Sequence, residues 1–556
     1  MAGNRTIAWA VPKVQQTPAF CATPGMTLAA LIRLASLGVA SIPSSQFQQR
    51  VPAMATSVAQ GLEKRRPIPG DRGLVRTLGA VAVALSAVAQ EYGSGINFVM
   101  PHSLESYPAA EGLVPLAMFV AGIVLIPEVV LFARYSAVMP RAGSTYVWLT
   151  RGLGPYAGFA IAFLWFIGIC GATGFLAFAT GTFIGDAAQA SGLATQWFTT
   201  RSGHLLTGLA AIWLIAALHL SGVRNYGYLI YIAGTLVAVA AMIVIVTGFV
   251  TTPESALPRL ADAVGFRPVP RPSQPSWTAF VSVIGLFMFA YGGLEASTSL
   301  GGEVANAHRN MPRGIIAGWA IAVVLYTLVS YALFHAVPWW SAVPILESGH
   351  GYLLTTPALI GLLAPRAIAV FLNILVAIIV VKTIAPQLLD ASRFLFAWAE
   401  DGFIPRRFAT TNAAHAPAPA IVLAASLSCL FLIDAVFGGW QIGVTLRAVS
   451  IAIVFSALGL ATALLAWWPS WRQARVFAAD CTRGGYVKVI AVCAVIIGVV
   501  LIVSVVHEQG TAWYFQPWFQ LAVAALVSVL LAMVANRRAT SRGDDFFARF
   551  RIPPPQ

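Results

Sequence analysis

Long apolar segments alternate with short polar segments along most of the chain. A helix that crosses the hydrocarbon core of a bilayer, about 30 Å thick, needs roughly 20 mainly apolar residues. Segments of this kind predict twelve transmembrane helices, at 78–100, 112–134, 155–184, 204–221, 227–250, 278–304, 314–336, 367–392, 419–437, 444–468, 487–506 and 516–535. We therefore expect an all-α integral membrane protein whose twelve-helix domain occupies residues 71–536.

The composition excludes a soluble enzyme. The chain is 58% hydrophobic and only 10% charged, whereas a soluble domain carries roughly 25% charged residues. The net charge of +14 would suggest nucleic-acid binding if the basic side chains shared one soluble face, but they are spread over the segments between apolar runs. The 5 cysteines are scattered and no HExxH is present, so we expect no metal site, no cofactor and no enzymatic activity.

The basic residues predict the orientation in the membrane. With the N-terminus inside, most of the 34 Lys and Arg residues fall in cytoplasmic segments, and Arg447 is among the few that fall outside. Cytoplasmic segments of membrane proteins are enriched in Lys and Arg. Both termini are therefore predicted to be cytoplasmic.

Three segments outside the spans have individual predictions. Residues 1–70 and 537–556 are predicted to be cytoplasmic tails. The first could be an amphipathic surface helix, a disordered tail, or a stretch upstream of a true start at Met54. Segment 251–276 holds six prolines and is predicted to be an extended extracellular loop.

Two of the predicted spans carry paired glycines and a carboxylate near their middle. The first has Glu91 followed by Gly93-Ser94-Gly95, and the sixth has Gly292-Gly293 followed by Glu295. Glycine weakens a helix by about 1 kcal/mol, so each helix is predicted to be interrupted there. Five spans apart, the two helices run in opposite directions, as in an inverted repeat with its binding site at the midplane. Close helix packing at small residues is the alternative explanation for either pair alone.

Interrupted helices would expose backbone groups that suit an α-amino acid. The N–H groups of Gly93, Ser94 and Gly95 would lose their helical partners and could bind a carboxylate. Freed carbonyls around Ala290–Gly292 could accept hydrogen bonds from an ammonium group.

Four motifs make the chain resemble the amino acid–polyamine–organocation superfamily of transporters. They are Gly93-Ser94-Gly95-Ile96, the loop Met139-Pro140-Arg141-Ala142-Gly143-Ser144-Thr145-Tyr146, the stretch Phe289-Ala290-Tyr291-Gly292-Gly293-Leu294-Glu295, and Ser392-Arg393 through Asp401-Gly402 to Pro405. The resemblance covers roughly residues 72–535. It implies a leucine-transporter-type fold, with a 5+5 inverted repeat and two C-terminal helices. It also implies transport of amino acids by alternating access across a plasma membrane, which the excess of Arg over Lys suggests is a bacterial inner membrane.

The resemblance also implies roles for individual residues. Gly93, Ser94 and Gly95, adjoined by Ile96, would bind the substrate carboxylate, and Ala290, Tyr291 and Gly292 would offer carbonyls to its amino group. Phe289 would cover the substrate, and Glu295 matches a carboxylate linked to proton sensing in some members. The chain departs from the family at Asn97, where many members have Phe, and at Ala307, which replaces a proline.

Three charges are predicted to lie inside the membrane, at Glu91, Glu295 and Lys382. A charge there is costly unless it is paired or hydrated. Lys382 resembles the position where sodium-coupled relatives surround a cation, so its ammonium could hydrogen-bond the carbonyls near Ala89 and Tyr92 and pair with Glu91. The transporter would then not need sodium, and proton-coupled uptake is the first expectation for its energetics, with exchange as the second. Lys382 could instead extend towards the cytoplasm, and Glu295 could bond freed backbone.

The remaining predictions concern the gate, the partners and two alternatives. Arg141, Arg393 and Asp401 are expected to act in a cytoplasmic gate, with Glu303 and Asp390 as gate or loop contacts. The partners would be an amino acid or amine, protons and the lipid bilayer. A carrier of cationic amines, favoured by two carboxylates near the site, and a sensor that does not transport remain alternatives.

Overall fold

The chain is described by a computed structural model, which covers residues 73–193, 196–198, 200–265, 273–347, 353–438, 441–468, 480–506 and 516–551. Within these ranges every regular element is a helix, apart from an isolated β-bridge between Leu78 and Val304. The predicted N-terminal tail, residues 1–70, lies outside the described residues.

Ten described helices are long and apolar enough to cross a membrane, so the protein is a multi-pass membrane protein. One of them is formed by a short 3-10 turn, Pro108–Leu113, continued by α6 and α7. The bounds are α6 Val114–Val124, α7 Ile126–Val138, α9 Pro155–Ala190, α10 Arg201–Leu220, α11 Val223–Val250, α15 Ala307–Ala336, α18 Arg366–Asp401, α19 Ala418–Phe437, α20 Gln441–Trp467, α22 Tyr486–Val506 and α23 Pro517–Thr540.

The first and sixth predicted spans are both interrupted at their glycines. The first consists of α4 (Ala80–Glu91), a π-helical turn over Gly95–Val99 and α5 (Met100–Ser106). The sixth consists of α13 (Trp277–Ala290), α14 (Leu294–Thr298) and a 3-10 turn over Ser299–Gly302. The breaks lie where the glycine pairs predicted them.

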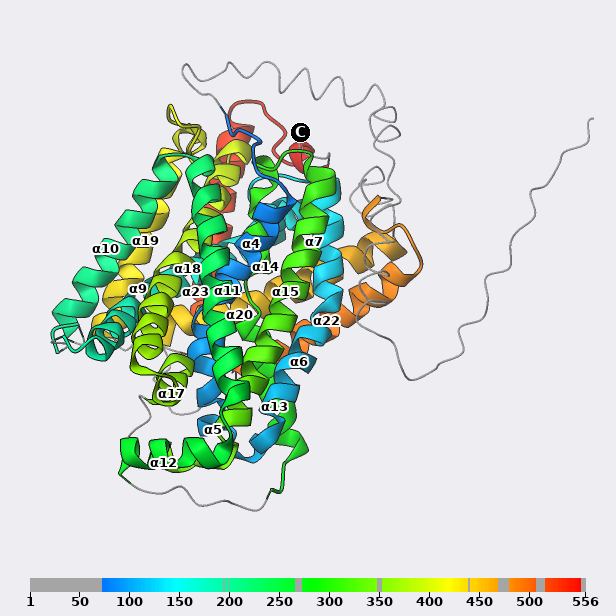
Figure 1. Cartoon of the computed structure of the whole chain (residues 1–556). Coiled ribbons are helices and arrows are strands. Elements are labelled where there is room, and N and C mark those ends of the chain that lie inside the picture. The colour runs from blue at the N-terminus through cyan, green and yellow to red at the C-terminus, as the bar shows by residue number, and fades with distance from the viewer. Residues whose placement is uncertain are drawn as a thin grey trace, which may run out of the picture.

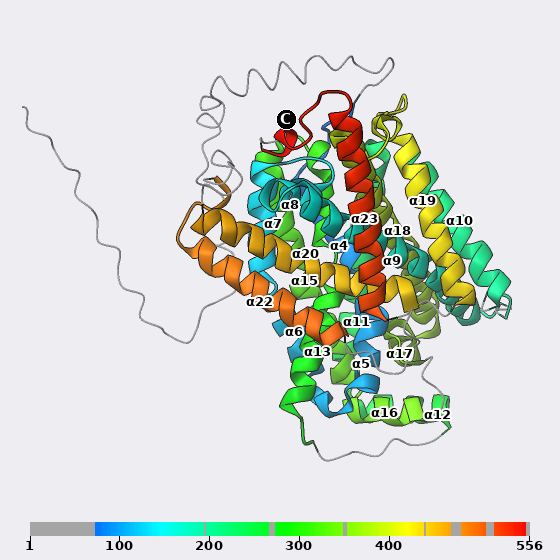
Figure 2. The same ribbon diagram turned by 180° about the vertical axis from the view of Figure 1, so that it is seen from behind.

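The two interrupted helices run antiparallel through the middle of the bundle. In Figure 1, α4 and α14 lie in the upper half and α5 and α13 in the lower half, and the halves that share a level are in contact. The first described residues and the C-terminus lie at the same end. Figure 2 shows α20 and α22 packed together and running obliquely across the bundle.

The prediction of an extended loop at 251–276 is wrong for the first half of this segment. Residues Pro253–Val264 form helix α12, which lies across the end of the bundle opposite the C-terminus. Pro253 is at the start of the helix, where its missing N–H has no cost. The buried side chains Ala256, Leu260 and Val264 recur every four residues, so one apolar face packs on the bundle. That burial outweighs the hydrogen bond lost at Pro258.

The C-terminal segment folds back on the bundle after α23 ends at Thr540. Phe546 and Phe550 are buried, and their ring centroids lie 5.2 Å and 5.7 Å from that of Phe403. The Arg151 guanidinium lies over the Phe550 ring, 5.0 Å from its centroid. The described C-terminal residues therefore pack against the end of the bundle that carries α8 (Ser144–Gly152).

Candidate functional site

The interruption of the first helix leaves carbonyl groups at the end of α4 without helical donors. Lys382, on α18, is 3% exposed. Its Nζ donates hydrogen bonds to the carbonyl of Ala89 and, at 3.0 Å, to the carbonyl of Tyr92. These are the backbone contacts that the sequence predicted for the ammonium group.

The predicted ion pair between Lys382 and Glu91 is not formed. Among the described side chains, neither Glu91 carboxylate oxygen has a hydrogen-bond partner, although the Lys382 charge acts on Glu91 from nearby. The reason is geometric, because the ammonium group is already directed at the two carbonyls of the broken helix.

The two breaks touch each other. A Cβ added to Gly95 would lie 2.9 Å from the Ala290 Cβ, and one added to Gly293 would lie 2.5 Å from the Glu91 Cγ. Real Cβ contacts are not that short, so these two glycines are what allows the helices to cross so closely. The predicted carboxylate-binding and amino-binding segments therefore meet at one point.

Tyr326, on α15, joins the two broken helices. Its hydroxyl donates to the carbonyl of Glu91 and, at 3.2 Å, to the carbonyl of Ala290. The carbonyl of Ala290, which the sequence predicted for the substrate amino group, thus already accepts from Tyr326. The Tyr291 hydroxyl donates to the Met118 carbonyl at 3.1 Å. Nothing in the local sequence around Tyr326 indicated this role.

The other predicted substrate residues are gathered at the same crossing. Gly93, Gly95 and Ile96 are buried, whereas Ser94 and Gly292 are half-buried. The backbone of Phe289 belongs to α13, but its side chain lies outside the described part of the structure. Asn97 Nδ2 turns back to donate to the Gly93 carbonyl at 2.8 Å.

A third buried carboxylate accompanies Glu91 and Glu295. Glu128, on α7, is 0% exposed, and its two oxygens accept no hydrogen bond from the described residues. Glu295 differs, because the backbone of Gly293 and of Glu295 itself lies close to its carboxylate. The charge of Glu295 acts on both Glu91 and Glu128. Sequence reasoning missed Glu128, although it lies inside a predicted span and the rule that selected Glu91 would have found it.

Arg447 lies inside the bundle, and its predicted place outside the membrane is wrong. It is 3% exposed, and its guanidinium lies 4.0 Å from the centroid of the Trp165 ring. Its charge acts on Glu295 and Asp390. Asp390 is fully buried and accepts hydrogen bonds from the Ser299 hydroxyl and, at 3.3 Å, from Trp165 Nε1.

The predicted gate residues all form ion pairs at the end of the bundle that carries the C-terminus. Arg393 bonds Glu303 through two nitrogens, at 2.6 Å and 3.1 Å, with both side chains 1% exposed. Arg141 bonds Glu400 at 2.7 Å, and this pair is only half-buried.

Asp401 accepts from Arg151 at 2.9 Å and from the Tyr146 hydroxyl at 2.7 Å. Burial, helped by the Asp401 charge, raises the pKa of Tyr146 well above its ordinary value. Tyr146 therefore stays protonated and keeps donating to Asp401.

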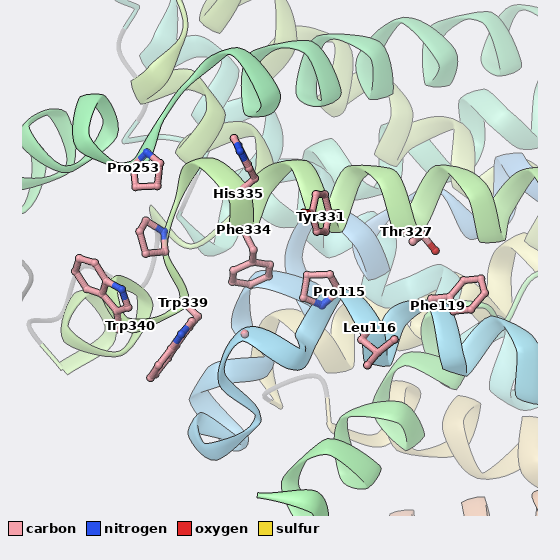
Figure 3. A pocket seen from close by; sticks show the side chains of 12 residues that line it. Pro115, Leu116, Phe119, Pro253, Thr327, Tyr331, Phe334, His335, Trp339 and Trp340 are labelled. Atoms are coloured by element: carbon pink, nitrogen blue, oxygen red, sulfur yellow. The ribbon is translucent and has the colours of Figure 1, made fainter. Parts of the chain in front are cut away.

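A pocket of about 680 Å³ opens elsewhere, between α6, α15 and α16 (Trp339–Glu347). Figure 3 shows its lining of prolines and aromatic rings, with His335 and Thr327 as polar neighbours. Its lining contains no acidic or Lys/Arg side chain, and Leu116 and Tyr331 on its rim are exposed on the outer surface of the bundle. Its position and chemistry do not match a site for a charged substrate at the breaks.

Comparison with known proteins gives a consistent set of similarities. The profile of the amino acid permease family matches residues 75–535. A branched-chain amino acid permease of Lactococcus lactis is 26% identical, over 65% of this chain and 77% of its own length. A serine/threonine exchanger of Bacillus subtilis is 23% identical, over 60% and 70%. An arginine/agmatine antiporter of Chlamydia trachomatis is 24% identical, over 66% and 71%. These relatives are named as carriers and not as enzymes.

Proposed function

Because the chain belongs to the amino acid permease family, we propose that it carries amino acids across the plasma membrane by secondary active transport. The observation that carries this proposal is the crossing of two interrupted helices at Gly95 and Ala290. Around it lie the N–H groups of Gly93–Gly95 on one helix and the backbone of Ala290–Gly292 on the other. This is the arrangement that a carboxylate and an ammonium on one small molecule require.

We propose a twelve-span architecture, made of ten long helices and the two interrupted ones. The antiparallel course of the first and sixth helices supports a 5+5 inverted repeat followed by α22 and α23. The abundance of Lys and Arg in segments at the end that carries the C-terminus supports a cytoplasmic position for both termini.

Transport in this proposal is coupled to protons and independent of sodium. Lys382 supports it, because its ammonium group already occupies the carbonyls of Ala89 and Tyr92. A positive charge held there would repel a sodium ion. The buried carboxylates Glu91 and Glu295, close to the breaks, support a part for carboxyl groups in this coupling.

Alternating access in this proposal would open and close the end of the bundle where the ion pairs lie. The pairs of Arg393 with Glu303, Arg141 with Glu400, and Arg151 with Asp401 link segments far apart in the sequence. We propose that they hold the cytoplasmic side closed and separate when that side opens.

A carrier of cationic amines is a second candidate. The three carboxylates Glu91, Glu128 and Glu295 favour it, because all three are buried and none forms an ion pair with a described basic side chain. A cationic substrate could supply the compensating charge. The presence of Lys382 and Arg447 in the same region weighs against it.

Thermal unfolding of the purified protein with a panel of L-amino acids and amines tests this proposal. A ligand at 100 times its Kd stabilises a protein by about 2.7 kcal/mol. Stabilisation by L-leucine, L-serine or L-arginine that is lost with the corresponding amino acid amides is the expected result. Stabilisation by agmatine or polyamines alone would favour the amine carrier. Uptake of the stabilising compound into proteoliposomes, at fixed pH gradient with and without sodium, then tests the coupling.

A further inference from the structure

Glu128 is a buried carboxylate to which the proposed proton-coupled transport has so far given no role. It lies in the first turn of α7, just after the interruption at Leu125 that separates α6 from α7. It is 0% exposed, and no donor in the described ranges reaches either of its oxygens. A buried carboxylate without partners is very unfavourable as an anion. Its presence on this helix therefore needs an explanation other than packing.

The groups that could influence Glu128 lie on α7 itself and on the helices that pack against it. The helices that pack against α7 are α6, α14, α15, α20 and α22. α6 carries no titratable side chain. α14 carries Glu295, α20 carries Arg447, and α7 itself carries Arg134 and Tyr135. The remaining titratable or charged residues are His308, Arg309, Arg313, Tyr326, Tyr331 and His335 on α15, and Tyr486, Lys488 and Cys493 on α22. Glu295 lies on α14, which packs directly against α7, and this places a second carboxylate near Glu128. Its charge has the same sign, so it disfavours the anion further.

The basic groups of the bundle centre act on other carboxylates. The Lys382 charge acts on Glu91, and the Arg447 charge acts on Glu295 and Asp390. Among the described residues, no basic side chain bonds either carboxylate oxygen of Glu128. Of Glu91, Glu128 and Glu295, Glu128 is therefore the carboxylate whose charge would have to be neutralised by a proton from water.

We propose that Glu128 is the carboxyl group that binds the coupling proton, with Glu295 as the neighbour whose charge keeps it bound. This rests on the proposed proton-coupled transport. One proton from water on one side of the membrane adds to the Glu128 carboxylate and gives the neutral acid. The same proton leaves to water on the other side after the bundle has changed conformation.

The position of Glu128 allows both states. Burial and the charge of Glu295 favour the acid, because two neighbouring carboxylates cannot readily both ionise in a low dielectric. The first turn of a helix favours an anion through its unpaired N–H groups, so water reaching the start of α7 would stabilise the carboxylate. Glu295 also interacts electrostatically with Arg447, which lies on α20. Movement of α20 relative to α14 would therefore change the electrostatic repulsion between Glu295 and Glu128.

The experiment compares wild-type protein, Glu128→Gln and Glu105→Gln in proteoliposomes that contain a pH-sensitive dye. Glu105→Gln is the matched control, because Glu105 is exposed. L-leucine, L-serine and L-arginine are each added outside, and internal acidification is measured beside the exchange of the same labelled amino acid. Glutamine resembles the protonated acid in shape, so exchange should be retained within a few-fold. Acidification should fall at least tenfold in Glu128→Gln and remain unchanged in Glu105→Gln.

Each other outcome is decisive as well. Acidification at the wild-type rate in Glu128→Gln would overturn the role of Glu128 while leaving proton-coupled transport intact. Exchange by the wild type without acidification would instead refute proton coupling itself, and this inference with it. If Glu128→Gln loses exchange, Glu128→Asp decides the matter. Acidification with a displaced pH profile supports the proton role, whereas an unchanged profile or none at all contradicts it.

Discussion

The Lys382 ammonium group bonds two carbonyls at the interruption of the first helix. Replacing Lys382 by Met keeps most of its volume but removes the donor that the Ala89 and Tyr92 carbonyls share. Leaving a buried acceptor unpaired costs about 1–3 kcal/mol, so we expect Lys382→Met to lower the unfolding temperature and to abolish most uptake. Thermal unfolding in detergent and uptake into proteoliposomes measure the two effects.

The matched control is Lys488→Met, which makes the same change at an exposed lysine. It should leave both quantities as in the wild type. Full uptake by Lys382→Met, with unchanged sodium independence, would contradict the role proposed for the ammonium group.

The π-helical turn Gly95–Val99 and the end of α13 depend on a close approach at Gly95. A Cβ there would lie 2.9 Å from the Ala290 Cβ and 3.1 Å from the Ala290 Cα, and backbone cannot move aside as easily as a flexible side chain. Overpacking of this kind costs about 1–3 kcal/mol. We expect Gly95→Ala to reduce stability by that amount and to weaken stabilisation by the amino acid, measured by thermal unfolding with and without ligand.

Gly361→Ala, in helix α17 (Thr356–Leu363), serves as the comparison. A Cβ at this position would meet its nearest atom at 3.5 Å, which is an ordinary contact. This variant should be neutral or slightly more stable. Equal effects of the two substitutions would show that the helix crossing has no special role.

The bundle as a whole closes at one end through ion pairs of very different burial. Arg393 and Glu303 are each 1% exposed, whereas Arg141 and Glu400 are 20% and 34% exposed. Removing one partner of a buried pair costs about 3–5 kcal/mol, whereas an exposed pair contributes about 0–1 kcal/mol. We expect Glu303→Gln to destabilise the protein strongly and Glu400→Gln to have little effect on the unfolding temperature.

The double variant Glu303→Gln with Arg393→Gln distinguishes the cost of losing the ion pair from the cost of leaving the Arg393 guanidinium buried without a partner. It should recover part of the stability, because no unpaired buried guanidinium remains. Additive losses would mean that the two side chains do not depend on each other. Uptake measured on the same three variants tests whether this end takes part in gating.

Much of the architecture could be predicted from local sequence. The length of an apolar run shows whether a helix can cross the bilayer, and glycine pairs weaken a helix wherever it packs. The ten long helices and the breaks at Gly93 and Gly292 were therefore predictable, as was the direction of Lys382 towards a broken helix. The α12 helix was missed because six prolines outweighed its four-residue apolar repeat.

The partners of the buried charges depend on helices that are distant in the sequence. Lys382 bonds a carbonyl 290 residues away, and Tyr326 joins backbone segments 235 and 36 residues away. When every face of a helix is apolar, the pattern of apolar residues does not indicate which face packs against which neighbouring helix. The sequence by itself thus determined the membrane class, the helices and the two breaks. The position of Arg447 over Trp165 and the isolation of Glu128 required the packed structure, because burial and charge pairing are properties of the assembled bundle.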